Sequence, residues 1–218
     1  MKIVLLGAPG AGKGTQAKLI CDYYKIPLIS TGDIFRAQIR EKSTLGIKAN
    51  QYIQKGELVP DDLTIAIVKE VLNEKKTSKD FLLDGFPRNL HQVEKLEEIL
   101  AEKKDYIDKA FLINVSKKNI LERVSGRRFC YQCGANYHIQ FNPSKSENKC
   151  ELCGNALIQR TDDKENIVLD RLSIYSKTIE PIVKYYIERE KLEIIKGNAE
   201  VDEVFSNICN SLKELRRN

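Results

Sequence analysis

The chain lacks several features that would assign it to other classes of protein. No stretch approaches the roughly 20 consecutive apolar residues that a membrane-spanning helix needs. There is no internal repeat or low-complexity segment. The net charge of +5 is not gathered into a tail, because pairs such as Lys75-Lys76 and Arg216-Arg217 stand among acidic neighbours. Such pairs are typical of solvated helix ends, so neither a membrane nor a nucleic acid is the expected partner.

The residues that are present suit a globular α/β protein. Hydrophobic residues make up 42% of the 218, enough for a core, and charged residues make up 31%. This length fits one α/β domain with an insertion, or two small domains. The apolar run after Lys2 is short, and glycines and Lys13 interrupt it, which indicates a first core strand rather than a signal peptide. A cytoplasmic location is therefore expected.

A glycine-rich segment follows that first strand. Residues 7–15 read Gly-Ala-Pro-Gly-Ala-Gly-Lys-Gly-Thr and lead into a helix expected over residues 15–24. Glycines let backbone N–H groups turn toward an anion, and the helix N-terminus adds its positive dipole end. Lys13 supplies a full charge for nucleotide phosphates, so the segment predicts a phosphate-binding loop. Gly14 stands where the usual pattern has a hydroxyl, and Thr15 comes one place later.

Strand and helix patterns alternate along the rest of the chain. Strands are expected over residues 3–6, 27–29, 81–83, 110–115 and 192–195. Helices are expected after the N-cap pair Asp61-Asp62 through about Asn73, over residues 90–103, 117–125 and 167–188, and from about Val201 to the C-terminus. This alternation predicts a mostly parallel sheet with helices on both faces and ligands beyond the carboxyl ends of its strands. Residues 30–59, helical without a strand, and residues 127–163, which lose helical periodicity, look like two insertions.

Four of the six cysteines form two Cys-x-x-Cys-Gly turns. Cys130 and Cys133 make the first, Cys150 and Cys153 make the second, and sixteen residues lie between the two pairs. Four thiolates at this spacing predict a tetrahedral Zn²⁺ site that is structural, because a filled shell leaves no position for water. Disulfides are the alternative, but they are uncommon in the cytosol. The two remaining cysteines, at positions 21 and 209, are expected to be small buried residues, and His138 is not needed as a ligand.

A second motif, Phe-Leu-Leu-Asp-Gly-Phe-Pro-Arg, covers residues 81–88. A buried strand that ends in Asp84 places a carboxylate where Mg²⁺ can be held through waters. Gly85 allows a substrate to approach the backbone, and Arg88 can fork onto a phosphate. Ser30 and its neighbours can start a helix, which would carry Arg36 one turn further on.

Arginines gather at both ends of the cysteine segment. Arg123 and Arg127 are four residues apart, Arg160 precedes two aspartates, and Arg171 lies on the next helix. A guanidinium stays charged and holds two phosphate oxygens at once, which suits it to phosphoryl transfer better than lysine.

These motifs together resemble the nucleoside monophosphate kinases, above all the adenylate kinase family in its long form with a four-cysteine zinc lid, over essentially the whole chain. The resemblance implies a P-loop three-layer α/β fold with a five-stranded parallel sheet. It implies a core domain (residues 1–29, 60–125 and 164–218), a helical AMP-binding insertion (30–59) and a small zinc-ribbon-like β lid (126–163). It further implies Mg²⁺-dependent phosphoryl transfer from ATP to AMP, giving two ADP, by a monomer with a structural Zn²⁺.

The resemblance also implies the residues of the site. The catalytic set is Lys13, Asp84, Arg88, Arg123, Arg127, Arg160 and Arg171. The ATP-binding set is Gly10, Ala11, Gly12, Lys13, Gly14, Thr15, Arg127, Asn136, Tyr137 and, through its backbone carbonyl only, Ala199. The AMP-binding set is Thr31, Arg36, Glu57, Leu58, Val59, Gly85, Phe86, Pro87, Arg88, Gln92, Arg160 and Arg171. The amide of Gln92 offers a donor and an acceptor that complement adenine.

Other functions are also compatible with the motifs. A kinase for another nucleoside monophosphate, or one using GTP, would share most of these residues. A zinc-ribbon ATPase that binds nucleic acid would bind tightly in a steeply salt-dependent manner. A non-catalytic nucleotide sensor would keep the phosphate-binding loop but lose the arginines, which this chain retains.

Overall fold

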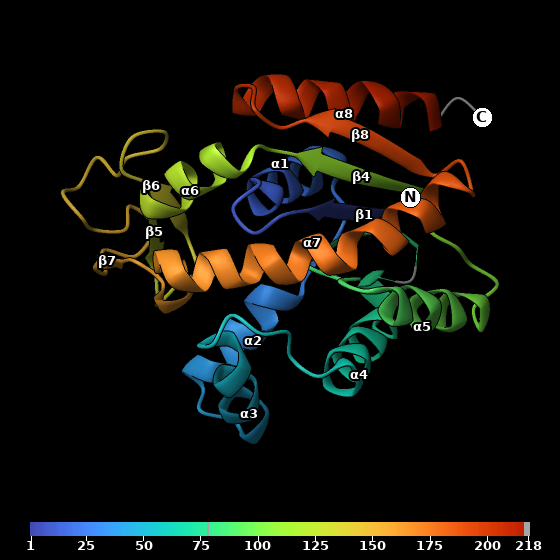
Figure 1. Cartoon of the computed structure of the whole chain (residues 1–218), viewed down its shortest axis with the longest axis horizontal. Helices are drawn as coiled ribbons and strands as arrows, with labels where there is room; N and C mark the ends of the chain where they lie inside the picture. Colours follow the sequence, from blue (N-terminus) through green and yellow to red (C-terminus); the bar gives the residue numbers. More distant parts are fainter. Residues whose placement is uncertain (78, 216–218) are drawn as a thin grey trace.

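The computed structural model describes residues 1–77 and 79–215 of the chain. Its centre is a five-stranded parallel sheet with the strand order β2-β3-β1-β4-β8 (Figure 1). The strands are β1 (Lys2–Gly7), β2 (Leu28–Ser30), β3 (Phe81–Asp84), β4 (Lys109–Asn114) and β8 (Leu192–Lys196). The predicted fold class and all five predicted core strands are confirmed, with boundaries that shift by at most one residue.

Helices cover both faces of this sheet. The helices on the sheet are α1 (Lys13–Tyr24), α4 (Asp61–Leu72), α5 (Leu90–Ala101), α6 (Lys117–Ser125), α7 (Glu165–Ile187) and α8 (Val201–Leu215), and two more, α2 (Thr31–Arg40) and α3 (Thr44–Ile53), lie in the first insertion. Short 3₁₀ turns form η1 (Lys75–Thr77) and η2 (Thr161–Asp163). In Figure 1, α7 runs across the sheet from the cysteine segment to α5. The expectation that the last helix reaches the C-terminus, including Arg216-Arg217, lies partly outside the described residues.

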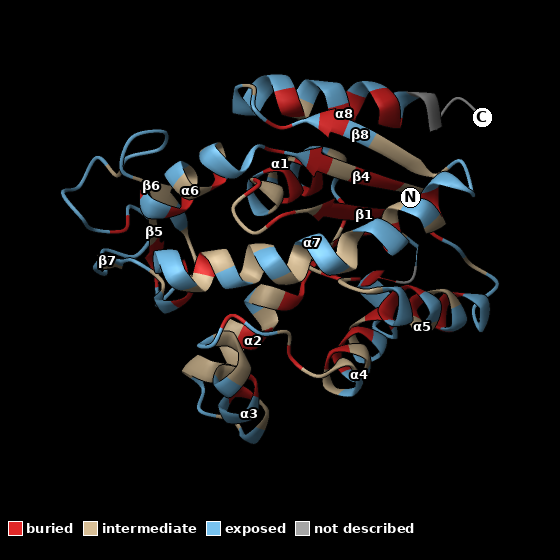
Figure 2. Ribbon diagram, viewed as in Figure 1, coloured by how far each residue is buried: buried red, intermediate tan, exposed pale blue. Residues whose placement is uncertain are grey.

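Two apolar layers form the core, one on each side of the sheet. Successive side chains of a strand point to opposite faces, so Ile3 and Leu5 enter one layer while Val4 and Leu6 enter the other. The first layer also contains residues of α1 and α8, and the second contains residues of α4, α5 and α7. Figure 2 shows buried residues along the central strands and on the helix surfaces that face them. This three-layer packing fixes the strand ends that carry the site.

The carboxyl ends of three neighbouring strands meet at one edge of the sheet. In the parallel register, Asp84 of β3 pairs with Leu5 of β1 on one side and with Ser30 of β2 on the other. The loops after β1, β2 and β3 therefore emerge side by side. This is the edge where ligands of open α/β sheets bind.

The N-termini of α2 and α4 differ in how well the sequence predicted them. Ser30 is the N-cap of α2, and its Oγ accepts a hydrogen bond from Asp33 N–H at 3.3 Å, as expected. The prediction that Asp61-Asp62 caps the next helix is wrong. Pro60 occupies the N-cap of α4, and both aspartates lie in the first turn. Their charges still favour the positive helix end, but the Asp61 carboxylate accepts hydrogen bonds from elsewhere.

The segment predicted to be helical without a strand, residues 30–59, is helical from Thr31 on, because Ser30 ends β2. Residues 31–59 contain α2 and α3, and a small apolar cluster that includes Phe35, Ala49 and Val59 packs them together with α4. Within residues 126–163, β5 (Arg127–Cys130) pairs antiparallel with both β6 (Asn136–His138) and β7 (Leu157–Ile158).

In the described part of the chain, no helix combines the length and the apolar character that a membrane span requires.

Candidate functional site

The glycine-rich loop joins β1 to α1, as predicted. Helix α1 begins at Lys13, with Gly12 as an N-cap in the left-handed region at φ 92°. The Lys13 ammonium donates hydrogen bonds to the carbonyl oxygens of Gly7 at 2.7 Å and Ala8 at 3.0 Å. A Cβ on Gly10 would lie 2.5 Å from the Val124 side chain, so only glycine lets the loop pass beneath α6. The loop is thus folded tightly around its lysine.

Asp84 lies next to the start of α1. A Cβ on Gly14 would be 3.6 Å from Asp84 Oδ2, which places this carboxylate beside the backbone where the usual pattern has its hydroxyl. Burial lowers the pKa of Lys13 to about 8, although the charge of Asp84 opposes that shift. Burial likewise raises the pKa of Asp84, although the charge of Lys13 opposes it. Both charged groups are therefore poorly solvated, and their mutual attraction does not offset the cost of removing each from water.

A second group of polar side chains gathers around Gly85. Thr31 Oγ1 donates a hydrogen bond to the Gly85 carbonyl at 3.0 Å, and Arg88 Nε donates to the same oxygen at 2.7 Å. Gly85 has φ 81°, and a Cβ there would lie 2.9 Å from Thr31 Oγ1. The predicted acceptor residues Thr31, Gly85 and Arg88 are therefore in contact, and a side chain at position 85 would push them apart.

One cavity joins the two groups. Cations from both line it: Lys13 from the glycine-rich loop, Arg88 from the loop after β3, and Arg171 from α7. Its apolar wall is made by Leu58, Ile174, Tyr175, Ile179 and Ile182. The empty space measures about 630 Å³ including the open mouth. A cavity lined by both cations and apolar side chains suits a phosphorylated compound with an aromatic base.

The arginines at the ends of the cysteine segment pair with two adjacent aspartates. Arg127 makes two hydrogen bonds to Asp163, and Arg171 Nη1 donates to Asp162 Oδ2 at 2.6 Å. Both aspartates are buried. These charge-assisted hydrogen bonds fix both guanidinium groups in place, and Arg171 is the one of the two that lines the cavity. The sequence showed the aspartates but not this positioning role.

Arg160 and Arg123 are held differently. The guanidinium of Arg160 lies over the Phe129 ring, 4.5 Å from its centroid, and donates to Asn136 Oδ1. Arg123 Nη2 donates to the Gly197 carbonyl at 2.7 Å, and its Nη1 donates to the Ala11 carbonyl of the glycine-rich loop at 3.4 Å. The sequence did not indicate that Phe129 supports Arg160, because its segment, Arg-Arg-Phe-Cys, has no apolar-polar alternation.

Burial and neighbouring charges shift the pKa values of these arginines. It lowers the pKa of Arg88 to about 10 and that of Arg160 to about 9, with neighbouring arginines adding to the shift. Burial would lower the pKa of Arg127 as well, but hydrogen bonds and charge from Asp163 outweigh it and raise that pKa. All three stay protonated at neutral pH. The cluster is therefore a concentration of positive charge that an anion would relieve.

Other predicted ligands contact the cysteine cluster, are exposed to solvent, or are buried within the protein. The Tyr137 hydroxyl lies 3.6 Å from Cys150 Sγ and accepts from Glu151 N–H, so it contacts the cysteine cluster. Glu57 and Thr15 are exposed, whereas Val59, Phe86 and Pro87 are buried. Ala199 packs against the core layer that contains α8. Gln92 is buried, with both ends of its amide hydrogen-bonded within the protein.

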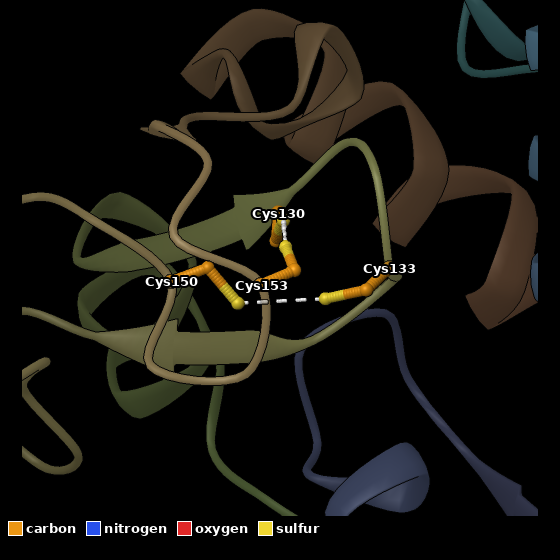
Figure 3. A group of neighbouring side chains, drawn as sticks. All are labelled: Cys130, Cys133, Cys150 and Cys153. Carbon is orange, nitrogen blue, oxygen red and sulfur yellow. Dashed lines mark hydrogen bonds between the residues drawn. The ribbon is translucent and has the colours of Figure 1, made fainter.

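The four clustered cysteines bring their sulfur atoms together. All four Sγ atoms lie within 4.8 Å of one another, and Figure 3 shows them converging from two loops. Each loop repeats the same turn: Gly134 N–H donates to the Cys130 carbonyl at 3.0 Å, and Gly154 N–H donates to the Cys150 carbonyl at 2.8 Å. None of the six cysteines is in a disulfide.

This donor set fits a zinc ion. Four thiolates at the usual Zn–S distance of about 2.3 Å stand roughly 3.8 Å apart at the corners of a tetrahedron. The observed pairs Cys130–Cys153 and Cys133–Cys150 are each 3.4 Å apart, close to that spacing. Cys21 and Cys209 are buried in the core, as expected.

A glycine-rich loop that ends in a helix can hold the phosphates of a nucleotide, and arginines across the same cavity can hold a second phosphate. Together with the three-layer fold of helices on both faces of a parallel sheet, this arrangement defines a nucleotide-dependent phosphotransferase of the P-loop class. A family model described as adenylate kinase matches residues 5–191. The chain belongs to the adenylate kinase family.

Individual relatives agree with this assignment over nearly their whole length. A protein named adenylate kinase from Clostridium botulinum (strain 657 / Type Ba4) is 53% identical over 212 residues, which cover 97% of this chain and 98% of the relative. One of the same name from Clostridium perfringens (strain SM101 / Type A) is 51% identical with the same coverage. Another from Clostridium tetani (strain Massachusetts / E88) is 53% identical.

Proposed function

We propose that this chain catalyses the reversible, Mg²⁺-dependent transfer of the γ-phosphoryl group of ATP to AMP, giving two ADP. The observation that carries the proposal is the shared cavity, which Lys13 enters from the donor loop and Arg88 enters from the acceptor loop. Phosphoryl transfer needs little covalent help from a protein, so positioning and charge stabilisation account for the catalysis.

On the donor side, the backbone of residues 10–15 and the Lys13 ammonium hold the β- and γ-phosphates. Asp84 is the carboxylate suited to Mg²⁺, because it lies beside the start of α1 and its burial disfavours an uncompensated charge. Bound Mg²⁺ would neutralise charge on the phosphate oxygens. We assign no general base, since Asp84 is better used on the metal. Asn136, Tyr137 and the Ala199 carbonyl are proposed to contact the donor nucleoside.

On the acceptor side, Arg36 and Arg88 hold the phosphate of AMP, with Thr31 and the Gly85 backbone beside them. The base lies against Leu58 and the neighbouring backbone of Glu57 and Val59. Phe86 and Pro87 shape the turn, and Gln92 reads the base edge. This set explains why an apolar wall and a cluster of cations border the same cavity.

Four arginines are proposed to surround the phosphoryl group during its transfer. Arg123, Arg127, Arg160 and Arg171 are proposed to contact the transferred phosphoryl group and its neighbours, and Arg160 and Arg171 also extend to the acceptor. Asp162 and Asp163 orient two of them. Their fixed charges are worth more in a water-poor site than in solvent.

Residues 30–59 and 126–163 are proposed to be mobile lobes on a core formed by residues 1–29, 60–125 and 164–218. A contact joins the two lobes directly, because Arg40 Nη1 donates to the Tyr131 carbonyl at 3.3 Å. Arg36 also lies over Phe129, 5.9 Å from the ring centroid. Closure of both lobes would exclude water, which otherwise competes with AMP for the phosphoryl group.

The four cysteines are proposed to hold a structural Zn²⁺ that stiffens the lid without touching phosphate. Thiols that serve as metal ligands need a reducing compartment, which favours the cytoplasm. We further propose that the enzyme acts as a monomer and does not bind nucleic acid, since its buried cations face the substrate cavity.

The low pKa of Lys13 predicts an alkaline limit for ATP binding. Above pH about 8 the free enzyme loses the charge on Lys13, so kcat/KM for ATP is expected to fall as pH rises through that value. Measurement of kcat/KM for ATP from pH 6 to 10 checks this. Lys13→Arg keeps its charge near pH 8, so in this variant the fall should move up to about pH 9, where Arg160 loses its proton. A wild-type profile that stays flat to pH 10 would contradict the assignment.

The direct test of the proposed reaction is a product balance. Purified enzyme is mixed with ATP, AMP and Mg²⁺, and all nucleotides are quantified over time. Two ADP should form for each AMP consumed, and ADP alone should return ATP and AMP. Equal or better use of another nucleoside monophosphate would instead favour the related kinases.

A further inference from the structure

The amide of Gln92 is held in one orientation by two partners of opposite kind. Its Oε1 accepts a hydrogen bond from Arg88 N–H at 2.7 Å, and its Nε2 donates to Asp61 Oδ1 at 2.6 Å. A backbone N–H can only donate and a carboxylate can only accept. If the amide turned over, it would place donor against donor and acceptor against acceptor. Gln92 is 1% exposed, so water could not relieve that conflict.

The Asp61 carboxylate is itself fixed by the start of α5. Asn89 Nδ2 donates to both of its oxygens, at 3.1 and 3.0 Å, and His91 Nδ1 lies 3.0 Å from Oδ2. Burial would raise the pKa of Asp61, but these hydrogen bonds and the one from Gln92 outweigh it and lower the pKa. At neutral pH the group is therefore an ionised, acceptor-only partner.

Each atom of the amide makes one of these hydrogen bonds and has the capacity for one more. Nε2 has a second hydrogen and Oε1 has a second lone pair. A 6-amino purine offers the complementary pair, because its amino group donates and N1 accepts. A 6-oxo purine offers the reverse, because O6 accepts and N1–H donates. The fixed polarity of Gln92 therefore suits the first kind of base and opposes the second.

We propose that Asp61 is a positioning residue that fixes the hydrogen-bonding polarity of Gln92 and thereby selects 6-amino over 6-oxo purine monophosphates as acceptors. This inference rests on the proposed function, in which Gln92 reads the acceptor base. The competing explanation is that Asp61 only ties the start of α4 to the start of α5. That role would affect stability but not the choice between acceptors.

The test compares AMP with inosine monophosphate as acceptor in the variant Asp61→Asn. An asparagine amide has nearly the same shape, but it can donate as well as accept, so Gln92 is no longer held in one orientation by this partner. The ratio of kcat/KM for AMP to that for inosine monophosphate should fall about tenfold, the worth of one charge-assisted hydrogen bond. The change should lie in the acceptor KM, with KM for ATP unaltered.

Matched variants separate positioning from charge and from stability. Asp62→Asn removes the neighbouring charge from the same helical turn, where the side chain is exposed, and should leave the ratio unchanged. Gln92→Leu should lower the ratio on its own, and adding Asp61→Asn to it should lower the ratio no further. Asp61→Ser, which also frees Nε2, replaces Asp61→Asn if the latter does not fold.

An unchanged ratio in Asp61→Asn, or a further fall in the double variant, would overturn the inference. A wild-type enzyme that forms no ADP from ATP and AMP would overturn the proposed function instead.

Discussion

Replacing Lys13 by alanine is expected to lower turnover about a thousandfold, the usual effect of removing one preorganised donor from a phosphoryl or acyl transfer site. The ammonium is half-buried at the end of the donor loop and lies in the same cavity as Arg88 and Arg171. Neighbouring arginines cannot replace it, because their hydrogen bonds to aspartates and backbone carbonyls fix them elsewhere. The measurement is kcat for ADP formation at saturating ATP and AMP.

The fold should survive this substitution. Lys13 donates to two carbonyl oxygens of its own loop, and losing those bonds costs about 1–3 kcal/mol, which leaves a chain of this size folded. Lys18→Ala is the matched control, since Lys18 is an exposed lysine on the same helix. Its turnover should equal that of the wild type. Turnover of Lys13→Ala within tenfold of the wild type would rule out the donor-loop assignment.

Loss of the metal is expected to have the second largest effect, on stability rather than chemistry. Residues 126–163 contain three short strands, and few of their side chains are buried, so the segment cannot build a core of its own. Cys133→Ser should abolish stoichiometric zinc and lower the first melting transition by about 10 °C. Much of the activity should remain at low temperature, because the cysteines lie apart from the cavity that carries Lys13 and Arg88.

Cys133 is the best site for this test, because its side chain is exposed and serine there leaves no buried cavity. Gln132→Ser, at an exposed position in the same turn, is the control and should keep both zinc and melting temperature. Calorimetry and metal analysis of the same samples give the two readouts. Metal-free wild-type protein that melts at an unchanged temperature would refute the zinc proposal.

Much of the fold could be predicted because its signals are local. Short apolar runs marked all five core strands, and the glycines of residues 7–15 marked the loop between β1 and α1. The Cys-x-x-Cys-Gly turns predicted their own geometry, since Gly134 and Gly154 both adopt positive φ values, 78° and 72°. Periods, turns and ligand spacings of this kind depend on neighbouring residues alone.

Pairings across the fold could not be predicted in the same way. The sequence shows Arg127, Asp163, Asp162 and Arg171, but only the packing of η2 against α7 decides which aspartate pairs with which arginine. The Asp61–Gln92 hydrogen bond joins residues 31 positions apart on two helices. Asp61 was therefore interpreted as an N-cap, which its local sequence favours and the tertiary structure overrides.

The direction in which the Tyr137 side chain points could not be predicted from the sequence either. Tyr137 sits on β6 where alternation allows either face, and its hydroxyl contacts Cys150 rather than the cavity. Its proposed contact with the donor nucleoside would therefore have to come from the ring and the backbone.

The most direct test of the account is the rate of ATP consumption with and without AMP. The site is proposed to bind two nucleotides end to end and to exclude water. Purified enzyme should therefore consume ATP about a hundredfold faster when AMP is present than when ATP is supplied alone. Equal rates in the two conditions would show that water is the acceptor and would contradict the account.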